Sequence, residues 1–370
     1  MSEIFWCTTC LNMSTRPRIE FDSQDRCNAC QWAEKKKTLD WGPRQVELKN
    51  LLDAHRSNDG SFDCVVPVSG GKDGSYIAYQ LKHVHGMHPL CVTVTPPLAS
   101  ATGAQNIQNF MNSGFDLIQV NAAAETMRKL NKAGFIEKGF PYFGWLAAIE
   151  SAVPKFAARF GISLVFYSEE GETEYGGTSK LASTPFYTPS FQKEVYLENG
   201  FELVAKAANV SQGELEFFAF VEDEEFEKLG LKIAHWSYFE DWNPYYNYLV
   251  AKEHCGLVEE SETNPGTFTN YAQNDQDLYS LHVYLMYLKF GFGRATQDAG
   301  IDIRRGAMSR DQAINLVRAY DGHYPEKYIQ IYLDYFKMTL EEFDLVLDKW
   351  ANRDLFTKVA GRWQPTFKII

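Results

Sequence analysis

Short apolar, β-branched runs alternate with longer segments of helical spacing along the first two thirds of the chain. Such runs predict buried strands, and their alternation with helices predicts an α/β fold with a doubly wound parallel sheet. From residue 247 onward the pattern is mainly helical, with capping boxes at Ser309/Gln312 and Thr339/Glu342. The expected strands are 64–68, 90–94, 116–120, 162–167 and 231–235. The expected helices are 34–56, 73–86, 102–112, 122–138 and a further one that ends at Arg159. Residues 178–229 are expected to be a mixture of loop and helix.

The first expected strand ends in a glycine-rich turn, Ser69-Gly-Gly-Lys-Asp-Gly-Ser75. A strand, a glycine turn and a helix N-terminus bring backbone N–H groups together around an anion. Lys72 can add a positive charge, and the two serine hydroxyls can donate hydrogen bonds. The spacing fits neither a Walker A loop nor a dinucleotide fingerprint. The turn therefore predicts a phosphate site, and an ordinary tight turn is the alternative.

Other strand ends supply further candidates, because ligands of such sheets bind at the carboxyl ends of the strands. Thr95 follows the second expected strand, and the acidic segment 168–177 follows the fourth. Glu169 and Glu170 begin that segment, where carboxylates could hold Mg²⁺ or orient a nucleophile. A solvated acidic loop is the alternative. The aromatic segment 236–246 could stack a sugar or nucleoside, or pack between domains.

Four cysteines form two C-x-x-C pairs near the N-terminus, separated by 16 residues. This spacing predicts a structural zinc site, because four thiolates complete a tetrahedral shell and leave no open position. A free dithiol, a redox pair or an iron–sulfur cluster are the alternatives. The expected ligands are Cys7, Cys10, Cys27 and Cys30.

Composition narrows the class of protein. The chain has 370 residues, is 45% hydrophobic and carries a net charge of −12. These values predict a globular protein, and the acidic charge disfavours a nucleic-acid partner. The chain contains no apolar run of about 18 residues, so no membrane span is expected. No secretory signal is visible either, and we therefore expect a cytoplasmic protein. The expected domains are a zinc ribbon (1–40), a nucleotide-binding domain (41–240) and a helical substrate or partner domain (241–370).

The glycine turn resembles the PP-loop of ATP pyrophosphatases, usually S-G-G-x-D-S, with Gly74 as an extra residue. Together with other segments it resembles the N-acetyl sugar amidotransferase family (the WbpG/PseA type) of surface-polysaccharide biosynthesis. That resemblance implies a PP-loop ATPase (HUP-like) fold. The segments that carry it are the four paired cysteines, 66–75, Glu169-Glu170, 175–177 and Lys289-Phe-Gly-Phe-Gly-Arg-Ala-Thr296.

The resemblance implies an ATP-dependent amidotransferase that converts an acetamido group of an acidic sugar, free or nucleotide-linked, into an acetamidino group. ATP would activate the amide oxygen before ammonia attacks, in the biosynthesis of an O-antigen or a nonulosonic acid. ATP, Mg²⁺ and Zn²⁺ are the implied cofactors. The expected catalytic residues are Lys72, Asp73, Glu169, Glu170 and Arg294, and the expected nucleotide-binding residues are Pro67, Ser69, Gly70, Gly71, Lys72, Asp73, Gly74, Ser75 and Thr95.

Ammonia needs a separate source, because the chain carries neither an N-terminal cysteine nucleophile nor a Gly-x-Cys-x-Gly elbow. We expect a glutamine amidotransferase subunit that delivers ammonia through a histidine-biosynthesis-like barrel subunit. Arg294, Arg304 and Arg305 are expected between helices, where they could meet an anionic substrate or lie on the surface. Two other functions stay open: a PP-loop tRNA-thiolation enzyme, which would need catalytic cysteines, and a nucleotide sensor without catalysis.

Overall fold

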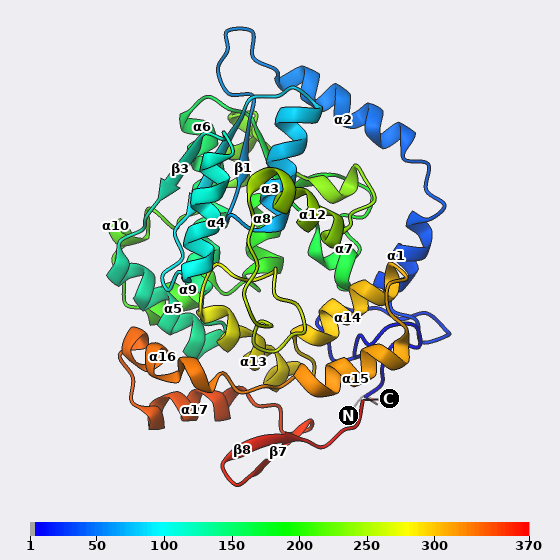
Figure 1. The fold of residues 1–370 in the computed structure, drawn as a ribbon. Helices are drawn as coiled ribbons and strands as arrows, with labels where there is room; N and C mark the ends of the chain where they lie inside the picture. Colours follow the sequence, from blue (N-terminus) through cyan, green and yellow to red (C-terminus); the bar gives the residue numbers. More distant parts are fainter. Residues whose placement is uncertain (1–3, 370) are drawn as a thin grey trace.

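A mostly parallel sheet with the strand order β3-β2-β1-β4-β6-β5 forms the centre of the computed structural model, which describes residues 4–369 (Figure 1). The five strands expected from the sequence are present within a few residues and run parallel to one another. The sixth strand, β5, is antiparallel to β6 and was not predicted. The strands are β1 (Cys64–Pro67), β2 (Pro89–Val94), β3 (Leu117–Val120), β4 (Leu164–Tyr167), β5 (Phe186–Tyr187) and β6 (Lys232–His235).

Alternate residues of β1 enter hydrophobic clusters on opposite faces of the sheet. Cys64 and Val66 pack in one cluster with residues of α2, α3, α4 and α12, whereas Val65 packs in another with residues of α6, α8 and α11. Burial on both faces explains why these strands read as continuous apolar runs. The helices are α2 (Gly42–His55), α3 (Lys72–Tyr79), α4 (Ala101–Asn112), α6 (Phe143–Arg159), α8 (Pro189–Phe191), α11 (Asp223–Lys228) and α12 (Pro244–Cys255).

The helix expected over 34–56 is two helices, α1 (Asn28–Lys36) and α2. A new helix begins at Gly42-Pro43, because a proline at the start of a helix needs no N–H partner. Leu48, Leu51 and Leu52 are buried as expected, but Val46 is 59% exposed. The helix expected over 73–86 consists of α3 and a π-helical turn over Gln80–Val84.

The C-terminal helices lie below the sheet in the view of Figure 1, coloured from yellow to red. The capping boxes at Ser309/Gln312 and Thr339/Glu342 are confirmed. Arg294 and Arg304 are the first and last residues of one helix, so the expectation that they lie between helices is wrong. The elements are α13 (Leu278–Phe290), α14 (Arg294–Arg304), α15 (Arg310–Tyr320), α16 (Ile329–Phe336), α17 (Leu340–Trp350) and a hairpin of β7 (Phe356–Val359) and β8 (Arg362–Pro365) that was not predicted.

One hydrophobic cluster joins the C-terminal helices to the sheet domain. It runs from Val94 at the end of β2 to Trp363 in the hairpin. Helix α13 lies within it, beside residues of α5 and α6. In the described part of the chain, no helix is both long and apolar enough to cross a bilayer. The remaining helices are α5 (Ala124–Lys138), α7 (Gly171–Tyr175), α9 (Phe201–Ala207) and α10 (Gln212–Leu215).

Candidate functional site

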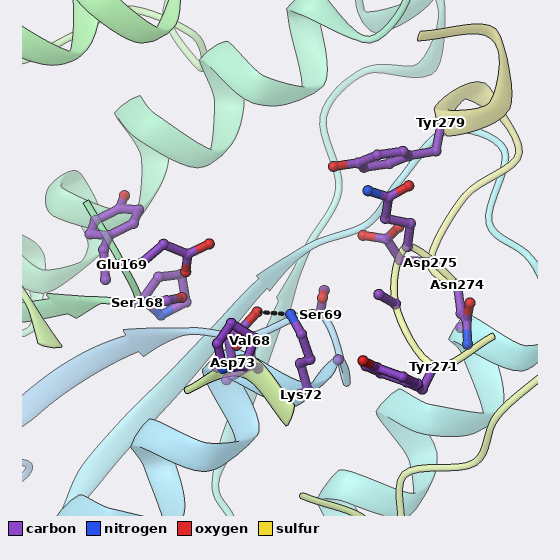
Figure 2. A pocket seen from close by; sticks show the side chains of 18 of the residues that line it. Val68, Ser69, Lys72, Asp73, Ser168, Glu169, Tyr271, Asn274, Asp275 and Tyr279 are labelled. Carbon is purple, nitrogen blue, oxygen red and sulfur yellow. Dashed lines mark hydrogen bonds and ion pairs between the residues drawn. The ribbon is translucent and has the colours of Figure 1, made fainter. Parts of the chain in front are cut away.

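A cavity of about 360 Å³ opens at the carboxyl ends of β1 and β4. The chain order of the sheet reverses between these two strands, and such a reversal leaves a crevice for a ligand. We refer to it as the loop cavity. One wall consists of the turn after β1 and of Ser168 and Glu169 after β4. Figure 2 shows the opposite wall, where Tyr271, Asn274, Asp275 and Tyr279 face Lys72 across the cavity.

The turn after β1 presents unpaired backbone donors to the loop cavity. The N–H groups of Gly70, Gly71 and Lys72 have no acceptor within the described part of the chain. Gly70 has φ +76°, and a Cβ there would lie 2.6 Å from the backbone nitrogen of Ile107. A Cβ on Gly74 would lie 2.7 Å from the carbonyl oxygen of Pro67. The glycines are therefore needed for the close approach that forms this anion cradle.

Lys72 and Asp73 form an ion pair at the base of the loop cavity (Figure 2). The side-chain amide of Asn247 donates to Asp73 Oδ1 over 3.1 Å. Burial opposes the charge on Lys72, but the carboxylates of Asp73 and Glu169 outweigh it and raise the pKa of the ammonium group. Lys72 is therefore a permanent positive charge beside the cradle.

Glu169 follows β4 and lies on the same wall of the loop cavity as the glycine turn. Burial raises its pKa to about 7, and the negative charge of Asp73 adds to this effect. The hydroxyl of Tyr175 donates to Glu169 Oε1 over 2.8 Å. A carboxylate whose pKa lies near neutral pH can accept and return a proton, so Glu169 is suited to act as a general base.

Arg294 reaches the loop cavity from the first turn of α14. Its Nε donates to Asp298 Oδ1 over 2.7 Å, and Asp298 in turn accepts from Thr267 and Thr269. With the Gln273 amide oriented so that its oxygen faces the guanidinium, Gln273 accepts a second bond from Arg294. Arg294 is thus a fixed cation on the wall that faces the cradle.

The structure brings most of the expected site residues together. Ser75 lies within α3 with a buried hydroxyl that has no partner in the described residues. Thr95 does not line the cavity and accepts a bond from Gln119. Glu170 is 1% exposed and caps α7 by accepting from the N–H groups of Glu172 and Thr173. The expected residues that line the cavity are Pro67, Ser69, Gly71, Lys72, Asp73, Gly74, Glu169 and Arg294, with Gly70 behind them in the turn.

Only Glu169 among the four glutamates of the acidic segment lines the loop cavity. The other glutamates of α7 bind side chains of the N-terminal module: Arg18 forms a bidentate pair with Glu172, with N···O distances of 2.7 and 2.8 Å. Trp32 and Lys36 donate to the two carboxylate oxygens of Glu174. These partners lie in remote parts of the sequence, so no local pattern distinguishes the glutamates.

Several residues of the cavity were not foreseen from the sequence. Asn247, which holds Asp73, and the wall residues Tyr271, Asn274 and Asp275 follow no periodic pattern. Burial raises the pKa of Asp275 to about 6, and its Oδ1 has no partner in the described residues. A density of Asn, Thr and Asp between residues 263 and 277 is the one signal that could have indicated this wall.

The four paired cysteines form a buried cluster whose sulfur atoms all lie within 4.8 Å of one another. The Sγ atoms of Cys7 and Cys30 are 3.8 Å apart, and those of Cys10 and Cys27 are 3.7 Å apart. The backbone N–H groups of Cys10 and Cys27 point to the Sγ of Cys7, as donors to a thiolate do. This set of donors can bind a structural metal ion such as Zn²⁺.

The other three cysteines are buried and do not line the loop cavity. Burial raises the pKa of the Cys64 and Cys91 thiols and raises that of Cys255 to about 11. Because the thiolate is the reactive form, these side chains are poor nucleophiles.

The opposite wall of the loop cavity lies in a region that matches a known family model. Residues 265–369 match the family model described as "LPS biosynthesis protein WbpG-like, C-terminal domain". Among curated proteins, none matches the chain. The matched region includes Tyr271, Asn274, Asp275, Tyr279 and Arg294, which face the glycine turn. The match covers less than a third of the chain and shows that residues 265–369 are similar to the C-terminal domain of WbpG-like proteins.

Proposed function

We propose that the chain is an ATP-dependent N-acetyl sugar amidotransferase of the PP-loop superfamily, which forms AMP and pyrophosphate. One observation carries the proposal: Gly71 and Lys72, whose backbone N–H groups are unpaired in the described residues, line a cavity whose opposite wall comes from the WbpG-like region. A glycine turn suited to phosphate and a wall from the WbpG-like region thus line one cavity.

The cradle residues suit the triphosphate of ATP. The N–H groups of the turn and the Lys72 ammonium group would hold the β and γ phosphates and stabilise the charge on departing pyrophosphate. Asp73 is the carboxylate beside them that could hold Mg²⁺, which would supply further charge neutralisation. Arg294 on the opposite wall would bind an anionic group of the sugar or the nucleotide.

The chemistry overcomes the poor reactivity of an amide. The acetamido oxygen forms a bond to the α phosphorus of ATP and pyrophosphate leaves, which converts the oxygen into part of a good leaving group. Ammonia then adds to the carbon, the C–O bond breaks, and AMP departs with that oxygen. Glu169 accepts the proton that the attacking nitrogen loses, so that the acetamidino group remains.

The substrate would be an acidic N-acetylated sugar, free or nucleotide-linked, on the route to an O-antigen or a nonulosonic acid. A separate glutamine amidotransferase subunit and a histidine-biosynthesis-like barrel subunit would supply ammonia. The reaction would take place in the cytoplasm.

The buried cysteines weigh against tRNA thiolation. Such an enzyme needs a reactive thiol near the nucleotide, and Cys64, Cys91 and Cys255 are buried outside the loop cavity with raised thiol pKa values. A nucleotide sensor would use the same cradle without releasing pyrophosphate.

The test is to incubate the protein with ATP, magnesium, an ammonium salt and a panel of UDP- and CMP-linked acetamido sugars. Pyrophosphate and the mass of the sugar are followed together. Pyrophosphate release coupled to replacement of one oxygen by NH supports the proposal. Pyrophosphate release that depends on tRNA would overturn it in favour of thiolation, and ATP binding without any turnover would favour the sensor.

A further inference from the structure

A second cavity, of about 420 Å³, lies next to the loop cavity and shares Gln273, Asn274 and Tyr279 with it. Segment 273–279 therefore has one cavity on each side. In Figure 2, Asn274 and Tyr279 are seen from the loop cavity, across from Lys72. We call the second space the rear cavity.

The side chain of Gln276 lines the rear cavity and has no hydrogen-bond partner. It is 3% exposed, and neither its Oε1 nor its Nε2 is paired within the described residues. A buried amide without partners destabilises the fold, so such a group points to a ligand that completes its bonds. Its neighbour Gln273 differs, because that amide is engaged by Arg294.

Two carboxylates of the rear cavity also lack donors. The side chains of Glu260 and Asp277 line it together with Lys327, and neither carboxylate accepts a hydrogen bond or forms an ion pair of 4 Å or less in the described part of the chain. Burial raises the pKa of Asp277, Lys327 opposes this effect, and the negative charge of Glu260 adds to it. Both carboxylates would gain from a bound cation.

Tyrosine rings complete the lining. Tyr320, Tyr324 and Tyr328 are half-buried and line the cavity. Arg362 already lies over the ring of Tyr324, and Lys327 lies over the ring of Tyr328. The acceptors that the cavity offers to a small ammonium ion are therefore its carboxylates and the amide oxygen of Gln276. The same carboxylates would repel a phosphate or the carboxylate of an acidic sugar.

We propose that the rear cavity binds ammonium and supplies the nitrogen that reacts in the loop cavity. A carboxylate of the rear cavity, Glu260 or Asp277, takes the proton that ammonium must lose before its nitrogen can attack as ammonia. This inference rests on the proposed amidotransferase function, in which ammonia is the nucleophile. It assigns the two sides of segment 273–279 to two substrates: the phosphates lie on the side of Lys72, and ammonium enters on the side of Gln276. The rear cavity is accordingly the place where a partner that produces ammonia would deliver it.

The Gln276→Leu variant tests the site without a cost to the fold. Leucine has a similar size and removes an unpaired polar group, so the unfolding temperature should stay equal or rise. We expect the KM for ammonium to rise about tenfold, with kcat at saturating ammonium and the KM for ATP unchanged. Gln108→Leu is the matched control, because Gln108 is exposed on α4 and bonds only to Asn112 among the described residues.

A second measurement does not depend on turnover. Ammonium chloride should raise the unfolding temperature of the wild-type chain above that in sodium chloride of equal ionic strength, and Gln276→Leu should abolish the difference. An unchanged KM for ammonium in the variant, or an equal effect of potassium chloride, would overturn the assignment. If no sugar is converted but the ammonium effect is present and depends on Gln276, the proposed function fails while the ammonium site stands.

Discussion

The side-chain amide of Asn12 donates a hydrogen bond of 2.9 Å to the carbonyl oxygen of Tyr175. The same nitrogen lies 3.4 Å from the Sγ of Cys27, one of the four clustered thiols. Tyr175 in turn donates through its hydroxyl to Glu169 in the loop cavity. Three successive contacts therefore connect the cysteine cluster to the carboxylate that we expect to accept a proton.

Replacing Asn12 by alanine should loosen this connection while leaving all four thiols in place. We expect full zinc content, a kcat reduced roughly tenfold and a displaced pH profile, because Glu169 would lose its fixed position. Metal analysis and the pH dependence of pyrophosphate release check both parts. Asn112→Ala, at an exposed position of α4, is the control. An Asn12→Ala protein with the wild-type profile would show that the connection carries no effect.

Cys7→Ser should act on stability first. Loss of one thiolate opens the tetrahedral shell, and a domain held by a structural metal loses several kcal/mol, so we expect a decrease above about 3 kcal/mol in the free energy of unfolding. Urea denaturation and the zinc content per chain provide the measurement. Cys255→Ala, which removes a buried thiol outside the cluster, should leave the zinc content unchanged.

Lys72→Ala should abolish turnover in a protein that still folds. The variant removes the only positive side chain of the glycine turn, so we expect pyrophosphate release to fall at least about a hundredfold. Circular dichroism should be unchanged. Lys49→Ala, at a lysine of α2 whose side chain is 73% exposed, is the control. Wild-type turnover in Lys72→Ala would contradict the assignment of the cradle.

The pH dependence of the reaction should follow Glu169. Its pKa lies at about 7, so the base is absent below that value and kcat should rise as the pH increases through it. Glu169→Gln should be slow at every pH and should lack this limb. A wild-type rate that does not change between pH values on either side of about 7 would rule out Glu169 as the base.

Glu169 should also make the free energy of unfolding depend on pH, in the opposite direction to kcat. Folding raises the pKa of Glu169 from 4.5 to about 7, so the folded protein binds more protons than the unfolded chain between these values. The contribution of Glu169 to the free energy of unfolding therefore falls as the pH rises through that range. Urea titrations of the wild type and of Glu169→Gln over this range should differ, with the steeper fall in the wild type.

Local sequence patterns were sufficient for the main sheet. The runs at 64–68 and 90–94 are buried on both faces, so their composition alone indicates strands. The strand β5 has two residues and exists only because β6 offers it an edge. Its formation depends on a contact between distant segments, which no local pattern encodes.

The sequence predicted the site residues that lie in one continuous segment. It did not predict those whose role depends on contacts with distant parts of the chain. The glycine turn is a single continuous motif, so its lining of the cavity followed from the sequence. The acidic segment offers equivalent glutamates, and their roles are decided by Arg18 and Lys36, more than a hundred residues away. The expectation for Glu170 therefore selected a residue that caps α7.

The hydrophobic cluster that runs from Val94 to Trp363 restricts how the gene of this protein can be recombined. Genetic recombination that replaced the stretch matched by the family model would have to preserve the packing of α13 on α5 and α6, or the hybrid would expose apolar surface. The replacement segment would also have to place its wall of the loop cavity opposite the glycine turn. The two portions are consequently expected to descend together as one heritable unit, rather than as modules that are exchanged between genes.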